Sequence, residues 1–240
     1  GRVSFSAGSN LFVRTNAELE IGSSSLNFLR NATSNFTIET DGYVYMNGNL
    51  VNAWVGTEDF HPGSYVAIYG WNVADRLFDD ENEITNNSAG AKFGYLDIDI
   101  SSLTGNWTYV FPAQIFKLTT NDFYITNDTG DNITLNPGTI EIGGDFIVYG
   151  SGNIQVRSQS GSKILNVKGN FVKNGAGNFR LNVGTDITTP VELNVDGNFT
   201  VNDGFFNLDN GSTTNLTSRV NLKGDLFKAT GSFMTNSNTN

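Results

Sequence analysis

Cysteine is absent from this sequence of 240 residues, and histidine occurs once, at His61. Without cysteine the chain forms no disulfide and offers no thiolate to a substrate or a metal. A single histidine builds neither a Ser-His-Asp relay nor a multi-histidine metal site. We therefore interpret His61 as a solvated loop residue.

Positive charge and long apolar runs are also scarce. Lys and Arg number 14 against 24 Asp and Glu, which gives a formal net charge of −10. Neutralising phosphates takes clustered Lys and Arg, so no nucleic-acid partner is predicted. No apolar run approaches the roughly 18 residues of a membrane helix, and no charged-then-apolar leader is present. The sequence therefore predicts no membrane insertion, and we expect these residues to be a mature or trimmed segment without a signal peptide.

Helix-forming residues are sparse, whereas Asn, Thr, Ser and Gly number 33, 24, 19 and 27. Short alternations of apolar and polar residues recur instead, each closed by Gly, Asn or Asp. This pattern predicts many short β-strands.

One phrase repeats along the second half of the chain, as LNVKGNF at 165–171 and LNVDGNF at 193–199, with related copies at 140–146 and 220–226. Its glycines, at positions 144, 169, 197 and 224, are 25, 28 and 27 residues apart. A second glycine, followed by an apolar alternation, comes seven or eight residues after each. The repeated phrase and this second pattern share one period, which indicates a repeat architecture.

The repeat predicts an all-β fold, a parallel β-helix (β-solenoid) with coils of about 25–28 residues and one irregular insertion. In the copy at 193–199, Leu193 and Val195 are expected to face the core. Gly197 is expected to supply a backbone angle closed to most residues, so that Phe199 faces the core from a second side, and the other copies should do the same. Stacking should align Asn166, Asn194 and Asn221, and likewise Phe146, Phe171, Phe199 and Leu226. A β-sandwich would not require this agreement between copies. A calcium-binding nonapeptide roll has the wrong period.

We expect coils over residues 1–52, an insertion or irregular region over 53–112, and regular coils over 113–240. An earlier copy of the phrase is placed at Val44–Leu50. A degenerate coil is expected near Ile115, which lies 25 residues before Ile140. The last repeat stops just after its second glycine pattern begins, so further chain or a partner is expected to cover the last coil.

The phrase Leu-Asn-Val-x-Gly-Asn-Phe, in an acidic chain rich in Asn, Thr and Gly, resembles the β-solenoid repeats of large bacterial surface adhesins. It is similar to filamentous-haemagglutinin-like shafts and to repetitive surface proteins exported by type IX secretion. The resemblance covers residues 139–240 and one copy at 43–50. It implies an extracellular or cell-surface adhesin segment and carries over no catalytic residue.

Aromatic residues are concentrated in the expected insertion. Trp54, Trp71, Tyr95 and Trp107 are the candidate ligand-binding residues, because rings stack on the apolar face of a sugar while polar groups bind its hydroxyls. The alternative is a small hydrophobic core for the insertion itself.

Two acidic stretches are further candidates. Asp79, Asp80 and Glu81 could bind Ca²⁺, although the 12-residue calcium loop with its internal glycine is missing and a solvated loop is the alternative. Asp97 and Asp99 are two residues apart, so they lie on one face of a strand, as a pair of sugar-cleaving carboxylates requires. An exposed acidic strand face is the alternative for this pair.

The leading hypothesis is a non-enzymatic structural or adhesive module, a rigid segment of a larger bacterial adhesin, with no required cofactor. The alternative is a carbohydrate-active β-helix enzyme or a phage tailspike-type protein. Expected partners are a surface glycan or other cell-surface ligand, further domains of the same chain and the secretion machinery. Ice binding would need a Thr-x-Thr array in every coil, and none occurs.

Overall fold

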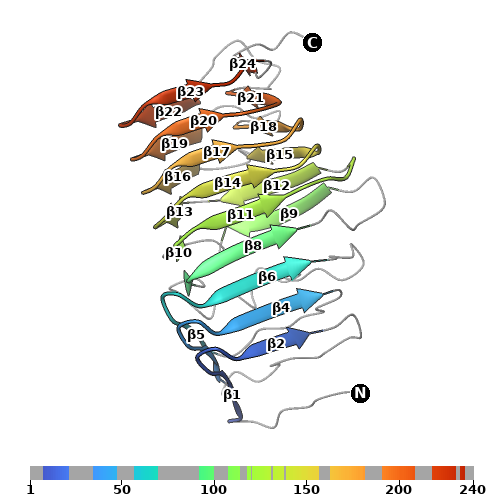
Figure 1. Cartoon of the computed structure of the whole chain (residues 1–240), viewed down its shortest axis with the longest axis vertical. Coiled ribbons are helices and arrows are strands. Elements are labelled where there is room, and N and C mark those ends of the chain that lie inside the picture. The colour runs from blue at the N-terminus through green and yellow to red at the C-terminus, as the bar shows by residue number, and fades with distance from the viewer. Residues whose placement is uncertain are drawn as a thin grey trace.

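The computed structural model describes residues 8–21, 35–47, 57–69, 92–99, 108–113, 118–119, 121–130, 132–137, 139–156, 163–181, 191–208, 218–230 and 233–235. Within these ranges there is no helix, and every strand pairs in parallel with its neighbours (Figure 1). The chain winds from coil to coil along one axis, with β1 and β2 at one end and β23 and β24 at the other. The predicted all-β parallel β-solenoid is confirmed.

One sheet of nine strands, called the long sheet here, runs the length of the shaft and faces the viewer in Figure 1. Successive coils contribute one strand each. Its members are β2 (Glu18–Ile21), β4 (Tyr43–Asn47), β6 (Tyr65–Tyr69), β8 (Tyr95–Asp99), β11 (Phe123–Thr126), β14 (Phe146–Tyr149), β17 (Phe171–Lys173), β20 (Phe199–Val201) and β23 (Leu226–Lys228).

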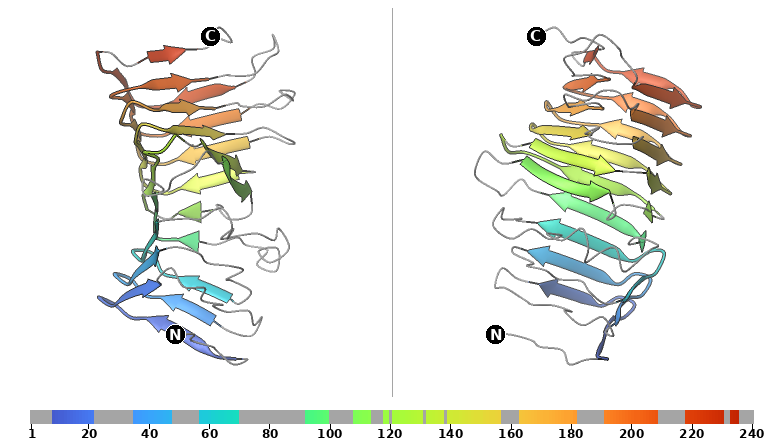
Figure 2. Two further views of the ribbon diagram at one scale, coloured as in Figure 1. Left: turned by 90° about the vertical axis from the view of Figure 1, so that its right-hand side faces the viewer. Right: turned by 180° about the vertical axis from the view of Figure 1, so that it is seen from behind.

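Three shorter sheets form the other sides, as the turned views of Figure 2 show. The first side sheet contains β7 (Lys92–Phe93), β10 (Leu118–Thr119), β13 (Thr139–Ile142), β16 (Lys163–Val167), β19 (Val191–Val195) and β22 (Arg219–Leu222). The second contains β9 (Thr108–Ala113), β12 (Asn132–Pro137), β15 (Asn153–Val156), β18 (Asn178–Arg180), β21 (Phe205–Asn207) and β24 (Phe233–Thr235). A three-stranded sheet of β1 (Asn10–Val13), β3 (Asn35–Ile38) and β5 (Thr57–Phe60) lies at the N-terminal end.

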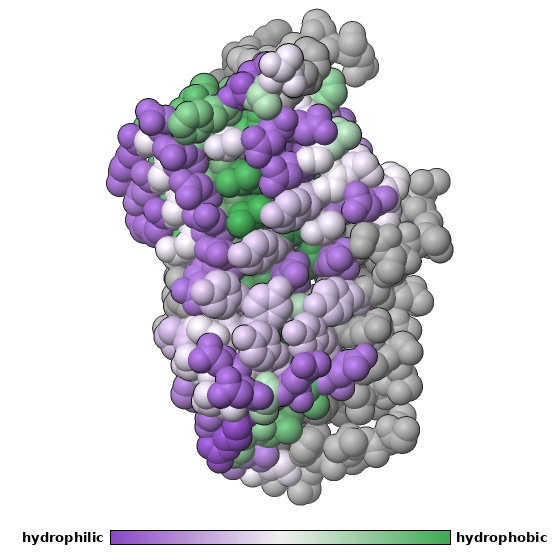
Figure 3. Space-filling model, in the orientation of Figure 1, coloured by the Kyte–Doolittle hydropathy of each residue, from purple (hydrophilic) through white to green (hydrophobic). Residues whose placement is uncertain are grey.

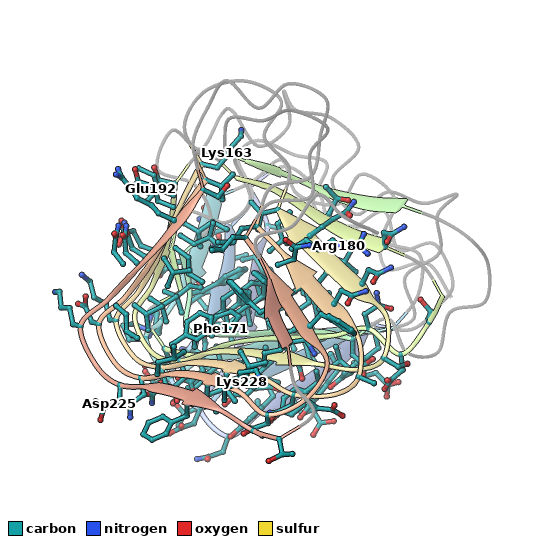
Figure 4. The ribbon with its side chains drawn as sticks, turned by 90° about the horizontal axis from the view of Figure 1, so that it is seen from above. Lys163, Phe171, Arg180, Glu192, Asp225 and Lys228 are labelled. Carbon is teal, nitrogen blue, oxygen red and sulfur yellow. The ribbon has the colours of Figure 1, made fainter. Side chains whose placement is uncertain are left out.

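The interior of the shaft is a column of apolar side chains. Strand alternation turns every second residue inward, and Phe171 points into the centre when the shaft is viewed from above, whereas Glu192 and Asp225 lie at its rim (Figure 4). Phe171 and Phe199 are fully buried and stack at 4.7 Å between ring centroids. Phe206 meets Phe199 edge-on at 4.8 Å. Rings from two sheets therefore interlock along the axis.

The predicted columns are confirmed by the register. Phe146, Phe171, Phe199 and Leu226 are successive partners in the long sheet. Asn166, Asn194 and Asn221 align in the first side sheet, where Asn194 Nδ2 donates to Asn166 Oδ1 and Asn221 Nδ2 to Asn194 Oδ1, each at 2.7 Å. The in-register stack thus gives each asparagine amide a hydrogen-bond partner of its own kind.

The glycine of the phrase is required for a different reason from the one predicted. Gly197 does not have a positive φ, and the left-handed glycine at this level is Gly204, with φ +69°. A Cβ at Gly197 would lie 2.6 Å from the carbonyl oxygen of Gly169, to which Gly197 also donates its N–H at 2.8 Å. Coils approach so closely at this corner that no side chain fits between them.

The residue after that glycine joins adjacent coils through its side chain. Asp145 Oδ1 accepts the backbone N–H of Asn170 at 2.6 Å, and Asn170 Oδ1 accepts that of Asn198 at 2.8 Å. The same contact links Asp122 to Asp145 and Asn198 to Asp225. The Gly-Asn and Gly-Asp pairs of the sequence are therefore steps of one polar ladder, which satisfies a backbone donor at every corner.

Two predicted alignments between coils are wrong. Val44 lies in the long sheet, in the inward column that reaches Phe146 through Val66, Leu96 and Phe123, so the phrase at Val44–Leu50 is not equivalent to that beginning at Ile140. The coil predicted near Ile115 is present, as β10 to β12, but Leu118 pairs with Glu141, an offset of 23 residues where 25 was expected. Apolar alternation is the same in every strand, so a phrase can match the wrong sheet.

The region 53–112 contributes strands to the shaft. Strands β5 to β8 lie within it, β9 begins in it, and β6 and β8 connect β4 to β11 in the long sheet. Residues 70–91 and 100–107 lie outside the described part of the chain. The division at 52 and 112 stays a prediction, while the described strands run through it in register.

Replacing Phe199 with Ala should lower the free energy of unfolding by about 3–5 kcal/mol, because the change removes a ring packed between Phe171 and Phe206. Asn202→Ala is the matched control on the exposed surface of the same coil. Denaturant titration measures both. Equal losses would contradict the assignment of the inward face.

Replacing Asn170 with Ala should cost about 0.5–1.5 kcal/mol, because the exposed N–H of Asn198 exchanges its side-chain acceptor for water. Asn170→Asp keeps the acceptor oxygen but replaces the Nδ2 that donates to Asp145 Oδ1 at 3.1 Å, so it should recover only part of this loss. Thermal unfolding of the two variants compares them. A loss of the same size in both would show that the ladder does not depend on the acceptor.

Candidate functional site

Tyrosines gather on the outer face of the long sheet between β4 and β14. Strand alternation places them outward, opposite the inward Val44, Val66 and Leu96. Their rings form a pale band across the middle of the face in Figure 3. The set contains Tyr43, Tyr45, Tyr65, Tyr69, Tyr95, Tyr124 and Tyr149. We call this surface the tyrosine face.

Three of these rings follow one another along the shaft. Tyr43, Tyr65 and Tyr95 are register partners in β4, β6 and β8, with ring centroids 5.8 and 6.1 Å apart at the two steps. Beside them, Tyr45 and Tyr69 are stacked at 6.0 Å. Because the strands fix the spacing of these rings, the face is an aromatic platform that needs little reorganisation to bind a flat apolar surface.

A depression of about 400 Å³ opens at the edge of this platform. Its walls are Asp41, Tyr43, Gly63, Tyr65, Tyr95 and Tyr124. Asp41 occupies the turn before β4 in a left-handed conformation, with φ 56°, and its N–H donates to the Gly63 carbonyl at 3.1 Å. The stacked turns hold the rim, and the volume suits one or two sugar-sized groups.

Carboxylates bind two of the tyrosine hydroxyls. Tyr65 donates its O–H to Asp97 Oδ2, and Tyr124 donates its O–H to Asp122 Oδ2, each at 2.9 Å. Burial, and then the nearby Asp97, raises the pKa of Tyr65 above the ordinary tyrosine range, and burial raises that of Tyr124 in the same direction. Burial raises the pKa of Tyr69 to about 12. These phenols therefore stay neutral near pH 7 and act as donors to carboxylates, not as bases.

Asp97 and Asp99 lie on the outer side of β8, as their spacing predicts. Burial raises the pKa of Asp97, the hydrogen bond from Tyr65 opposes that shift, and the charge of Asp99 adds to it. A carboxyl of raised pKa beside a second carboxylate is the arrangement that general acid catalysis on sugars uses. The same pair also provides acceptors for sugar hydroxyls.

Of the predicted ligand-binding residues, Tyr95 is placed, as a wall of the depression. Trp54, Trp71 and Trp107 lie outside the described residues, as do Asp79, Asp80 and Glu81 of the predicted calcium site. His61 is half-buried in the turn before β6, with its Nε2 3.6 Å from an oxygen of Asp59.

Sequence reasoning missed the share of the site that comes from outside the expected insertion, namely Asp41, Tyr43, Tyr45, Asp122 and Tyr124. A usable signal was present in the strand alternation. Tyr-Val-Tyr at 43–45 and Tyr-Val-Ala-Ile-Tyr at 65–69 put tyrosine on one face and aliphatic residues on the other. Only the stacking register shows that these faces form one surface.

Charge is distributed unevenly along the chain. Residues 1–140 hold 16 of the 24 acidic residues and 6 of the 14 basic residues, whereas residues 141–240 hold eight of each. The whole formal charge of −10 therefore arises in the part of the sequence that carries the tyrosine face, with Tyr149 the one member beyond it. None of the six residues that line the depression is basic.

The described residues contain no group of three or more His, Cys, Asp or Glu side chains placed to hold a metal ion. Nor does that part of the chain include a helix long and apolar enough to cross a membrane.

The fold defines the class of this protein as a β-solenoid with an aromatic outer face. Comparison with protein-family models, with curated proteins and with solved structures finds no match in any of the three.

A second chemically unusual group lies inside the shaft. Lys173 occupies an inward position of β17 between Val148 and Val201 and is 1% exposed. Its ammonium donates to the carbonyl oxygens of Asn174 and Gly175 at 3.0 and 2.6 Å. Burial lowers the pKa of Lys173 to about 8, and the charge of Asp203 opposes that shift. The interior therefore encloses an amine that is only partly protonated in mildly alkaline solution.

The lysine predicts a rise in stability with pH. In the unfolded chain its amine keeps the proton up to about pH 10.5, whereas the folded chain releases it from about 8, so the free energy of unfolding increases across that window. Lys173→Met should abolish this rise and be at least as stable as the wild type at pH 7, because no charge is buried. The exposed Lys168→Met is the control that should keep the rise. Parallel stability curves for Lys173→Met and the wild type, from urea titrations at a series of pH values, would contradict the burial of the amine.

Proposed function

We propose that this chain is a non-enzymatic module of an extracellular, cell-surface protein, in which a rigid β-solenoid presents the tyrosine face to a carbohydrate. The observation that carries the proposal is the register column of Tyr43, Tyr65 and Tyr95, which ends in a depression with Asp41 at its rim. Aromatic rings stack on the apolar faces of pyranoses, and the neighbouring carboxylates accept their hydroxyl hydrogens.

The architecture supports a structural role beside the binding role. Each coil packs only on its neighbours, so a stack of coils extends along one axis and holds its outer face at a fixed spacing. The resemblance of the repeated phrase to bacterial adhesin shafts supports placement at a bacterial cell surface. Under this proposal the partners are a surface glycan, further domains of the same chain and the secretion machinery that exports it.

A carbohydrate-active enzyme is the second candidate, favoured by the raised pKa of Asp97 beside Asp99. Two carboxyl groups on one face of a strand, one of them with a raised pKa, are suited to acid-assisted cleavage of a glycosidic bond. Binding is preferred because Asp97 accepts a hydrogen bond from Tyr65, which fits a positioning role in the platform.

Binding to a glycan array, followed by calorimetry with the best ligand, tests the proposal. Tyr43→Ala and Tyr95→Ala should each weaken binding by roughly 5- to 30-fold, because each removes one stacking ring. Tyr149→Ala is the matched control, since Tyr149 is 40% exposed on the same sheet, compared with 38% for Tyr43, and does not line the depression.

The same incubations are examined for new reducing or unsaturated ends. Binding without such ends supports a non-enzymatic module. Ends that accumulate with the wild type and not with Asp97→Asn would establish the enzyme alternative. Absence of binding to every glycan tested would overturn both carbohydrate functions.

A further inference from the structure

The depression offers hydrogen-bond acceptors and aromatic rings to a ligand, together with the hydroxyls of Tyr43 and Tyr95, which can still donate. The O–H of Tyr65 and that of Tyr124 are already given to Asp97 and Asp122, so these phenol oxygens offer lone pairs to a ligand. The face of each tyrosine ring carries the negative part of its quadrupole. A ligand group that enters here therefore meets acceptors and electron-rich rings.

Asp41 adds a full negative charge at the rim. Its backbone is tied into the stacked turns, because its N–H donates to Gly63 and its carbonyl accepts the N–H of Asn16 at 2.9 Å. Its carboxylate makes no hydrogen bond or ion pair with any residue that the structure describes. A charge held in place by its backbone, with its oxygens open, is suited to bind a cation from solution.

Among the residues that the structure describes, no Lys or Arg lines the depression. The lining set contains one carboxylate, four tyrosines and a glycine. Among the described residues up to position 140, ten are acidic and two are basic, so the coils that carry the site have the same sign of charge as Asp41. An acidic sugar would therefore be repelled, a neutral sugar would stack without electrostatic gain, and a positively charged group would gain from both the rings and the carboxylate.

We propose that the depression is an ammonium-binding site, and that the glycan bound by the tyrosine face carries free amino groups. This inference rests on the proposed glycan binding and specifies its ligand as a chain of amino sugars that are not acetylated. One protonated amine lies in the depression between the rings of Tyr43, Tyr65 and Tyr95, near Asp41. The neighbouring sugar rings stack on the part of the tyrosine face beside the depression, where the rings of Tyr45 and Tyr69 are stacked.

Calorimetry with three oligosaccharides of equal length tests the preference: a glucosamine oligomer, its fully N-acetylated form and a galacturonic acid oligomer. The glucosamine oligomer should bind about tenfold more tightly than the acetylated form, as a cation–π contact combined with a charge contact provides. The uronic acid oligomer should bind most weakly.

A small probe separates the ammonium site from the sugar. Choline should displace the glucosamine oligomer, whereas 3,3-dimethylbutan-1-ol, which has the same shape without the charge, should not. Equal competition by the two would show that the depression selects shape alone and would overturn the ammonium assignment.

Asp41→Asn is the test variant, because asparagine also tolerates the left-handed backbone at this turn and only the charge is lost. It should remove most of the preference for the amine and leave binding of the acetylated oligomer unchanged. Asp225→Asn, near the opposite end of the shaft, removes the same charge and should keep the preference.

The outcomes distinguish the two proposals. Tighter binding of the acetylated oligomer, or an undiminished preference in Asp41→Asn, overturns the ammonium site and leaves glycan binding standing. An equal loss in Asp41→Asn and Asp225→Asn assigns the preference to overall charge and also overturns the site. If choline binds and no glycan does, the proposed function is overturned while the ammonium site stands.

Discussion

In-register parallel pairing between successive coils is the constraint on which the rest of this structure depends. Each coil satisfies its backbone N–H and C=O groups through the coils before and after it, so equivalent residues must lie above one another. Phe171 meets Phe199, and Asn166 meets Asn194. A residue is acceptable in such a stack only if it packs well against its own kind, and this is why the sequence repeats itself.

The constraint acts differently inside, at the corners and outside. Inside, it selects rings and aliphatic side chains that interlock across sheets. At the corner, it selects glycine where the backbones come into contact, and Asn or Asp where an N–H needs a side-chain acceptor. Outside, packing places few demands on the side chain, so the outer positions are free to carry function.

The tyrosine face is a product of that freedom. The register that stacks Phe146 on Phe123 inside also stacks Tyr65 on Tyr43 outside, at the same coil spacing. The rings therefore lie in a fixed row without any loop to order them, which lowers the entropic cost of binding an extended ligand. Two of the hydroxyls, those of Tyr65 and Tyr124, donate to Asp97 and Asp122, so these two phenol oxygens offer only lone pairs to a ligand.

The sequence by itself determined the class of fold and the faces of its strands. The repeated phrase specified stacked coils, and its alternation identified Leu193, Val195 and Phe199 as core residues, because strand geometry requires side chains to point to opposite sides in turn. It also placed Asp97 and Asp99 on one face. These are local properties, which a single coil already shows.

Only the tertiary structure decided which coil lies on which, and with what offset. The phrase at Val44–Leu50 matched the wrong sheet, and Gly197 was explained by backbone angle when the cause is contact with Gly169 in the next coil. The site likewise combines Asp41, Tyr43, Tyr65, Tyr95 and Tyr124, which come from separate turns and strands. Alternation repeats every two residues in every strand, so it cannot specify a partner. Register depends on how whole coils pack, and that is settled by contacts between residues that are distant in the chain.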